Sequence, residues 1–216
     1  MAESFDFLKP TEAAVVSGVD LKIVNHAIDR ALPPRVVRRG KGKSVWAEAC
    51  FYIAFYHRSA GKLTADERRF AILDIDKRVE AAGEETSRWH SLRRHCVVQH
   101  DFLALDLDAF WYETHERWGR YLAAREIVTV DPAILGGTPV IAGTRVPVHD
   151  VAASVAAGIS PSRIASAYPL LKAEHIELAS LYAKANPLQG RPPERRPVEG
   201  AKINSKRTIE RRRQSA

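Results

Sequence analysis

The chain has 216 residues, of which 45% are apolar, and Lys and Arg outnumber Asp and Glu by 33 to 26. This length and composition exclude a fully disordered chain and predict one large or two small globular domains, of which we favour two. No apolar run approaches the ~20 residues that cross a bilayer, and the first residues lack the basic and apolar regions of a signal peptide. We therefore expect a cytoplasmic protein with no membrane partner.

Residues 1–94 are predicted to form an N-terminal domain that begins as a helix-turn-helix. Thr11 is placed to cap a short helix that ends at Gly18, and Asp20 is placed to cap a second helix over residues 21–32. Apolar residues recur there at helical spacing and predict a core-facing side made of Leu21, Val24, Ile28 and Ala31. Residues 35–43 then read as a basic β-hairpin, or wing, whose glycines allow a tight reversal.

A concentration of positive charge lies in this unit. Residues 19–43 hold seven basic and two acidic residues, a local net charge of +5. A solvated surface is the simpler interpretation of a charge run, but the helix-turn-helix spacing before the hairpin favours DNA binding. The residues predicted to read bases or hold phosphates are Lys22, Asn25, His26, Arg30, Arg35, Arg38, Arg39, Lys41 and Lys43.

The middle of the chain predicts helices and one hairpin. Ser44 is expected to open a strongly apolar, buried helix that ends at Gly61, and Thr64 with Glu67 forms a capping box for a helix reaching about Ala82. Residues 83–94 are polar and expected to be irregular. Residues 95–126 are then predicted as a linking unit, with an antiparallel hairpin over residues 96–105 and a helix over residues 108–125 capped by Asp108. Cys50 and Cys96 are expected to be reduced, packed thiols.

Residues 127–187 predict a second, smaller domain. Short strands are expected over residues 127–130, 139–141 and 145–148, followed by helices near residues 151–157, 162–167 and 172–185. Gly158 ends the first of these helices and Ser160 caps the second, so the connection is short enough for a helix-turn-helix-like bundle of three helices. The predicted fold class is therefore mainly α with short β-hairpins: a winged helix-turn-helix domain plus a small three-helix domain.

The glycine, proline and threonine pattern of this second domain is recognisable. Its positions are Gly136, Gly137, Pro139, Gly143, Thr144, Arg145, Pro147, Gly158, Tyr168, Pro169, Asn186 and Pro187. The pattern resembles a small bacterial domain known from VapB-like antitoxins. The resemblance implies self-association into a homodimer, binding to operator DNA, and neutralisation of a PIN-like ribonuclease toxin of the VapC type. A dimer also suits a palindromic operator.

Residues 188–216 predict a basic tail that is disordered on its own. The segment holds nine basic and three acidic residues and almost no apolar periodicity. It is interpreted as a DNA clamp, a solvated terminus or a partner-binding arm, and the resemblance favours the last, because arginine pairs well with the carboxylates of a metal-dependent nuclease. The candidates for toxin binding are Arg191, Arg195, Arg196, Arg207, Arg211, Arg212 and Arg213.

No residue pattern supports catalysis, so we predict a non-enzymatic protein without cofactor or metal. The segment from Gly40 to Ser44 ends like a phosphate-binding loop, but Val37 stands where that motif needs its first glycine. His90, His95 and His100 are evenly spaced without completing a metal-ligand set. The favoured function is an antitoxin that represses its own operon. The alternative is a stand-alone transcriptional regulator without a toxin partner.

Overall fold

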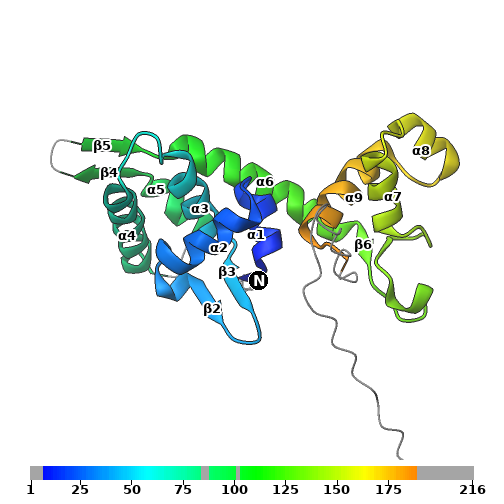
Figure 1. The fold of residues 1–216 in the computed structure, drawn as a ribbon, viewed down its shortest axis with the longest axis horizontal. Coiled ribbons are helices and arrows are strands. Elements are labelled where there is room, and N and C mark those ends of the chain that lie inside the picture. The colour runs from blue at the N-terminus through cyan, green and yellow to red at the C-terminus, as the bar shows by residue number, and fades with distance from the viewer. Residues whose placement is uncertain (1–6, 84–87, 101–102, 189–216) are drawn as a thin grey trace, which may run out of the picture.

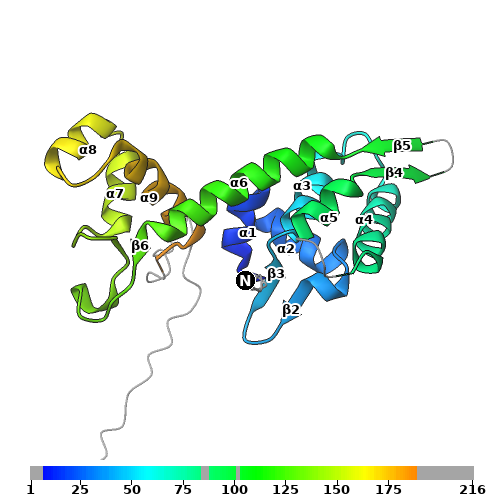
Figure 2. The same ribbon diagram turned by 180° about the vertical axis from the view of Figure 1, so that it is seen from behind.

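The structure is a computed structural model that describes residues 7–83, 88–100 and 103–188. The described chain forms two lobes that are joined by the long helix α6 (Asp108–Glu126), as both ribbon views show (Figure 1, Figure 2). It is mainly helical with a few short antiparallel strand pairs, which confirms the predicted fold class. The predicted tail, apart from Leu188, lies outside the described residues.

The N-terminal lobe begins with a helix pair and a small sheet. Its first elements are β1 (Phe7–Leu8), α1 (Pro10–Ser17), α2 (Leu21–Arg30), the short 3-10 helix η1 (Pro34–Val36), β2 (Val37–Arg39) and β3 (Lys43–Trp46). The three strands are antiparallel in the order β1-β3-β2, with Val37 opposite Val45. Gly18 ends α1 as predicted, because its positive φ of 68° suits the left-handed helix cap. Asp20 is the N-cap residue of α2, although its side chain makes no capping hydrogen bond.

The rest of this lobe consists of α3 (Ala49–Arg58), α4 (Ala65–Ala81), α5 (Arg88–Arg94), β4 (Val97–His100) and β5 (Leu103–Asp106). The capping box of Thr64 and Glu67 is confirmed. Two expectations were wrong. The apolar helix expected from Ser44 begins only at Ala49, because the preceding residues form the central strand β3, and α5 occupies part of the segment expected to be irregular.

A large buried cluster fills the N-terminal lobe. It includes Val24 and Ile28 of α2, most of α3, and Trp111, Trp118 and Tyr121 of α6. Leu21, which was predicted to face this core, is instead 42% exposed at the start of α2. Cys50 and Cys96 are free and buried, as expected of packed thiols.

The C-terminal lobe is smaller and has its own core. Its elements are β6 (Val128–Thr129), η2 (Leu135–Gly137), β7 (Val140–Ile141), α7 (Val148–Ala156), α8 (Pro161–Ala167) and α9 (Ala173–Ala185). The core gathers apolar residues from β7, α7, α8 and α9 with Leu171. The strand expected over residues 145–148 is reduced to a single bridge between Pro147 and Val140, because α7 begins at Val148.

Within the parts of the chain that the structure describes, none of the helices combines the length and apolar content needed to span a membrane.

Candidate nucleic-acid interface

Helix α2 separates an apolar face from a polar one. Val24, Ala27 and Ile28 are buried, whereas Lys22, His26 and Arg30 are exposed and Asn25 is half-buried. The predicted outward set is therefore on the accessible side of the helix. Three residues, Val19 among them, separate the end of α1 from the start of α2, a connection of helix-turn-helix length.

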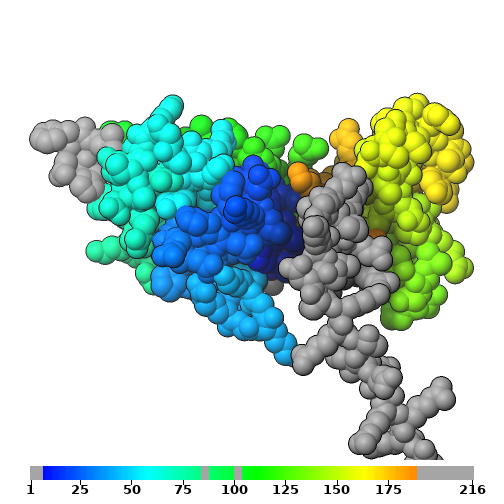
Figure 3. Space-filling view, viewed as in Figure 1, coloured from blue at the N-terminus to red at the C-terminus, as the bar shows by residue number. Residues whose placement is uncertain are grey.

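The β2–β3 hairpin projects from the N-terminal lobe next to α2 (Figure 3). Its turn is closed by a hydrogen bond from the Gly40 amide to the Gly42 carbonyl oxygen, 3.1 Å apart. Arg38, Arg39 and Lys41 belong to this hairpin, and all three are exposed along it. The guanidinium carbon of Arg38 lies 3.7 Å from the ring centroid of Phe7, a cation–π contact that orients this side chain.

Asp29 connects the hairpin to α2. The Lys43 ammonium donates hydrogen bonds to both carboxylate oxygens at 2.6 and 2.7 Å, and Arg39 lies 3.4 Å away. The hydrogen bond from Lys43 is the main cause that lowers the pKa of Asp29. The exposed polar face of α2 and the cationic hairpin are thereby held side by side as one surface. We call this surface, formed by Lys22, Asn25, His26, Arg30, Arg38, Arg39, Lys41 and Lys43, the basic surface.

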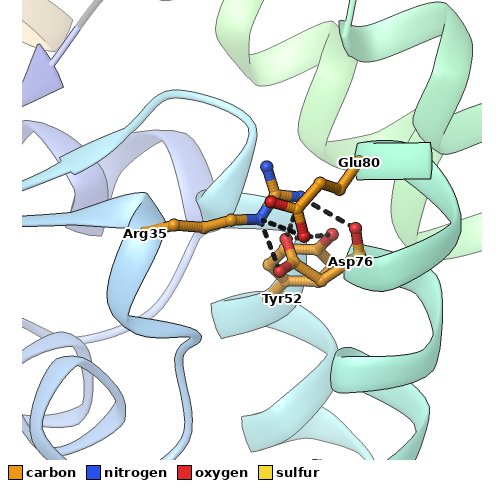
Figure 4. Close-up of polar contacts among 4 residues, drawn as sticks. All are labelled: Arg35, Tyr52, Asp76 and Glu80. Carbon is orange, nitrogen blue, oxygen red and sulfur yellow. Dashed lines mark hydrogen bonds and ion pairs between the residues drawn. The ribbon is translucent and has the colours of Figure 1, made fainter. Parts of the chain in front are cut away.

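Arg35 has a different place from the other predicted DNA-binding residues. Its Nε and Nη2 donate to the two carboxylate oxygens of Asp76, each at 2.7 Å, and Nη2 also donates to the Asp76 carbonyl oxygen at 2.8 Å (Figure 4). The Tyr52 hydroxyl lies 3.4 Å from the same carboxylate, and Glu80 is 3.9 Å from Arg35. Burial lowers the pKa of Arg35, but the bonds to Asp76 outweigh that effect and the pKa is raised. Arg35 therefore ties η1 to α4 inside the lobe and is not part of the basic surface.

Three contributors to this region carry no clear sequence signal. Asp29 is recognisable from the sequence only as an outward residue, and nothing in the local pattern marks Phe7 or Asp76. The partners of Phe7 and Asp76, which are Arg38 and Arg35, lie 31 and 41 positions away along the chain. Side-chain pairing at such separations depends on the folded chain and not on local spacing.

The residues considered for other chemistry lie in separate places. Among the described residues, no group of three or more His, Cys, Asp or Glu side chains is placed to hold a metal ion. His90 lies in α5, His95 follows it and His100 ends β4. Gly136, Gly137 and Gly143 have positive φ values, as expected of turn residues.

Comparisons with known proteins give a family match within the C-terminal lobe and a relative over nearly the whole chain. Residues 128–183, which run from β6 into α9, match the family described as "Protein of unknown function (DUF433)". The crystal structure of RV2018 from Mycobacterium tuberculosis aligns with 79% of this chain and 95% of its own, at 19% identity and a TM-score of 0.34. The "Uncharacterized protein y4eO" of Sinorhizobium fredii is 50% identical in an alignment that covers 97% of this chain and 96% of that protein. The chain therefore belongs to the same protein family as y4eO and carries a DUF433 domain in its C-terminal lobe.

Proposed function

We propose that this protein is a DNA-binding antitoxin, which uses its basic surface to bind a DNA duplex and represses its own operon. The observation that carries the proposal is the ion pair between Asp29 and Lys43, because it fixes a cationic hairpin beside the exposed polar face of α2. In a winged helix-turn-helix, the second helix enters the major groove while the wing contacts the backbone. Asn25 is suited to an adenine edge, Lys22 and Arg30 to guanine or phosphate, and Arg38, Arg39, Lys41 and Lys43 to phosphates.

The topology of the lobe supports this assignment. Helices α1 and α2 pack on the core with a short turn between them. Strands β2 and β3 follow α2 after the short helix η1, and β1 completes the sheet on the other side of β3. Among the nine predicted DNA contacts, Arg35 is the one that we withdraw from the phosphate set, since its donors are used by Asp76.

The DNA half of the proposal is tested by removing charge from the hairpin. We expect the Arg38→Gln/Arg39→Gln variant to bind a fragment of its own promoter about tenfold more weakly at ~0.1 M salt, because phosphate contacts release counterions. The slope of log affinity against log salt should fall by roughly 1 for each phosphate that the variant no longer neutralises. Fluorescence anisotropy measures both quantities. Arg163→Gln/Lys172→Gln, which removes two exposed cations from the C-terminal lobe, is the matched control. A slope equal to that of the unmodified protein would refute the assignment.

The C-terminal lobe is proposed to contact protein partners, including a second copy of the chain. Val130, Leu135 and Leu170 are 60%, 47% and 74% exposed, and a lobe this small leaves them uncovered. Leu170 lines a hollow of about 440 Å³ together with Ile134 and Val140. Leu170 is the one of these three exposed residues that lines the hollow, and exposed apolar side chains of this kind are typical of protein–protein contact surfaces.

The toxin half of the proposal rests on the DUF433-type domain and on the cationic sequence of residues 189–216. We propose that arginines of this tail cover the carboxylates of a PIN-like ribonuclease in the cytoplasm, so that the protein acts by occupancy and not by catalysis. Co-expression with the neighbouring reading frame tests this. We expect the full chain to form a stoichiometric complex with the product of that reading frame. Deletion of residues 189–216 should abolish both the complex and toxin neutralisation, while promoter binding should persist.

Full neutralisation by the truncated protein would exclude the tail as the inhibitor. Promoter binding without any captured nuclease would instead support the stand-alone regulator, because such a regulator needs only the basic surface.

A further inference from the structure

A groove of about 600 Å³ lies between the two lobes. One face of α1 forms a wall of it, and the rest comes from the α1–α2 connection, the start of α2, His57 of α3, the helices α6 and α9, and Pro187. Apolar side chains form much of the lining: Ala14, Val15, Val19, Leu21, Ile23 and Leu181. Local sequence patterns give no indication of this groove, because its lining residues come from separate segments of the chain.

The charged side chains of the groove are mostly cationic. Arg117 and Arg120 of α6 and Lys184 of α9 line it, whereas Asp20 is the one carboxylate among its described lining residues. Positions 117 and 120 share one face of α6, and positions 181 and 184 share one face of α9, because they are three residues apart. The cations of the two helices therefore border the same partly apolar space.

These cations keep unused bonding capacity. Arg117 Nη2 lies 3.2 Å from Glu113, but its Nη1 is enclosed without an acceptor among the described residues. Arg120 has a carboxylate of Glu177 only at 3.8 Å and is 58% exposed, and no ion pair of Lys184 occurs within the described chain. The exposed Arg120 and Lys184 can therefore form charge-assisted hydrogen bonds with an incoming carboxylate, and such bonds are among the strong ones in proteins.

We infer that this groove binds an acidic, partly apolar segment of a partner protein. Within the proposed function, on which this inference rests, that partner is the toxin. The carboxylates of such a segment would meet Arg117, Arg120 and Lys184, while its apolar side chains would cover the walls. A DNA backbone would use the cations but would leave the apolar walls uncovered and would face Asp20. The chain's own residues 189–216 are excluded as the occupant because they are cationic themselves.

The place where the chain leaves the C-terminal lobe supports a protein occupant. Pro187 lines the groove, and Leu188, which follows it, is 67% exposed. The cationic residues 189–216 come directly after Leu188 in the sequence. A nuclease whose carboxylates bind this tail is therefore held at the edge of the groove. An acidic segment on the surface of that nuclease would then be present at high effective concentration next to the groove cations.

The test reverses the two accessible groove charges in the full chain. We expect Arg120→Glu/Lys184→Glu to bind the purified product of the neighbouring reading frame about tenfold more weakly, mainly through slower association, with a smaller difference at high salt. Arg163→Glu/Lys172→Glu makes the same charge change on exposed positions of the C-terminal lobe outside the groove and should bind like the unmodified protein. Surface plasmon resonance gives both rates, and the neutral Arg120→Gln/Lys184→Gln variant, with a smaller loss expected, serves if the reversal impairs folding.

The outcomes separate this inference from the proposed function. Equal toxin binding by the groove variants and the unmodified protein would overturn the inference and leave the antitoxin assignment intact. Loss of promoter binding with toxin binding unchanged would assign the groove to nucleic acid and also overturn it. An unmodified protein that binds promoter DNA but not the toxin would end the antitoxin half of the proposed function, and the inference with it.

Discussion

Arg35 and Arg38 stand in the same basic run of the sequence, yet the fold uses them differently. The guanidinium of Arg38 lies over the ring of Phe7 on the hairpin, whereas that of Arg35 is held by a carboxylate that is only 8% exposed. Charge patterning identifies the run but not the member that turns inward, because the deciding partner, Asp76, lies on a helix much farther along the chain. A basic run is therefore an upper bound on the residues available to DNA.

The Arg35–Asp76 pair is predicted to matter for stability more than for DNA contact. Arg35→Met leaves the Asp76 carboxylate buried without its main partner, which should lower the free energy of unfolding by about 3 kcal/mol. Arg35→Met/Asp76→Leu removes both charges and should recover much of that loss. Urea unfolding followed by tryptophan fluorescence measures the difference. A single variant as stable as the unmodified protein would show that the pair contributes little.

The two cysteines provide an independent probe of the same core. Burial raises the pKa of Cys50 well above its ordinary value, and burial raises the pKa of Cys96 to about 12. Because the thiolate is the reactive form, the folded protein should react with a disulfide reagent at about pH 8 only as fast as it opens. Arg35→Met should accelerate this reaction, and Arg163→Gln should not. Rapid labelling of the stable, unmodified protein would contradict the packing of both thiols.

At the scale of elements, local signals predict most of what the structure contains. The Thr64 capping box, the Gly18 helix end and the Ser160 cap are all present, because each depends on neighbouring residues. The start of α3 was misplaced because a buried central strand and a buried helix form an almost continuous apolar run from Val45 to Tyr56, in which periodicity cannot mark the boundary. The residues of the basic surface could largely be proposed from the sequence, but the groove and the Arg35–Asp76 pair could not, since both depend on how distant elements pack.

Two helix-ending glycines are predicted to differ in their tolerance of a side chain. Gly18 and Gly158 both have positive φ, at 68° and 79°, but a Cβ on Gly18 would lie 2.9 Å from Arg117, whereas one on Gly158 would meet nothing within 4 Å. Gly158→Ala should therefore cost about 1 kcal/mol from backbone strain alone, and Gly18→Ala should cost more because Arg117 must move. Thermal unfolding of the two variants gives the comparison. If both variants lost the same free energy of unfolding, or if Gly18→Ala lost less, the close approach of Gly18 to Arg117 would be unimportant for stability.

At the scale of the whole molecule, α9 connects the two cores. Ile176 and Ala179 belong to the core of the C-terminal lobe, whereas Ala185 at the end of the same helix is fully buried in the N-terminal cluster. Leu181, between them, packs against the N-terminal cluster and also lines the groove. The Tyr121 hydroxyl of α6 donates to Glu12 of α1 at 2.8 Å, which fixes α6 on the N-terminal side of the same junction.

This arrangement predicts that the lobes unfold together and that the end of α9 is responsible. Ala185→Leu overfills the buried junction, at a cost of about 1–3 kcal/mol, without touching the C-terminal core. We expect one calorimetric transition for the unmodified protein and two for this variant, with Ala173→Leu, at an exposed position of α9, behaving as unmodified. Promoter binding should survive in Ala185→Leu, because the basic surface lies wholly in the N-terminal lobe. The same variant should bind the toxin more weakly, because the groove is formed by both lobes and depends on how they pack. A single transition at an unchanged midpoint temperature for Ala185→Leu would mean that the junction around Ala185 does not couple the lobes. Contacts other than this junction would then have to fix the geometry of the groove.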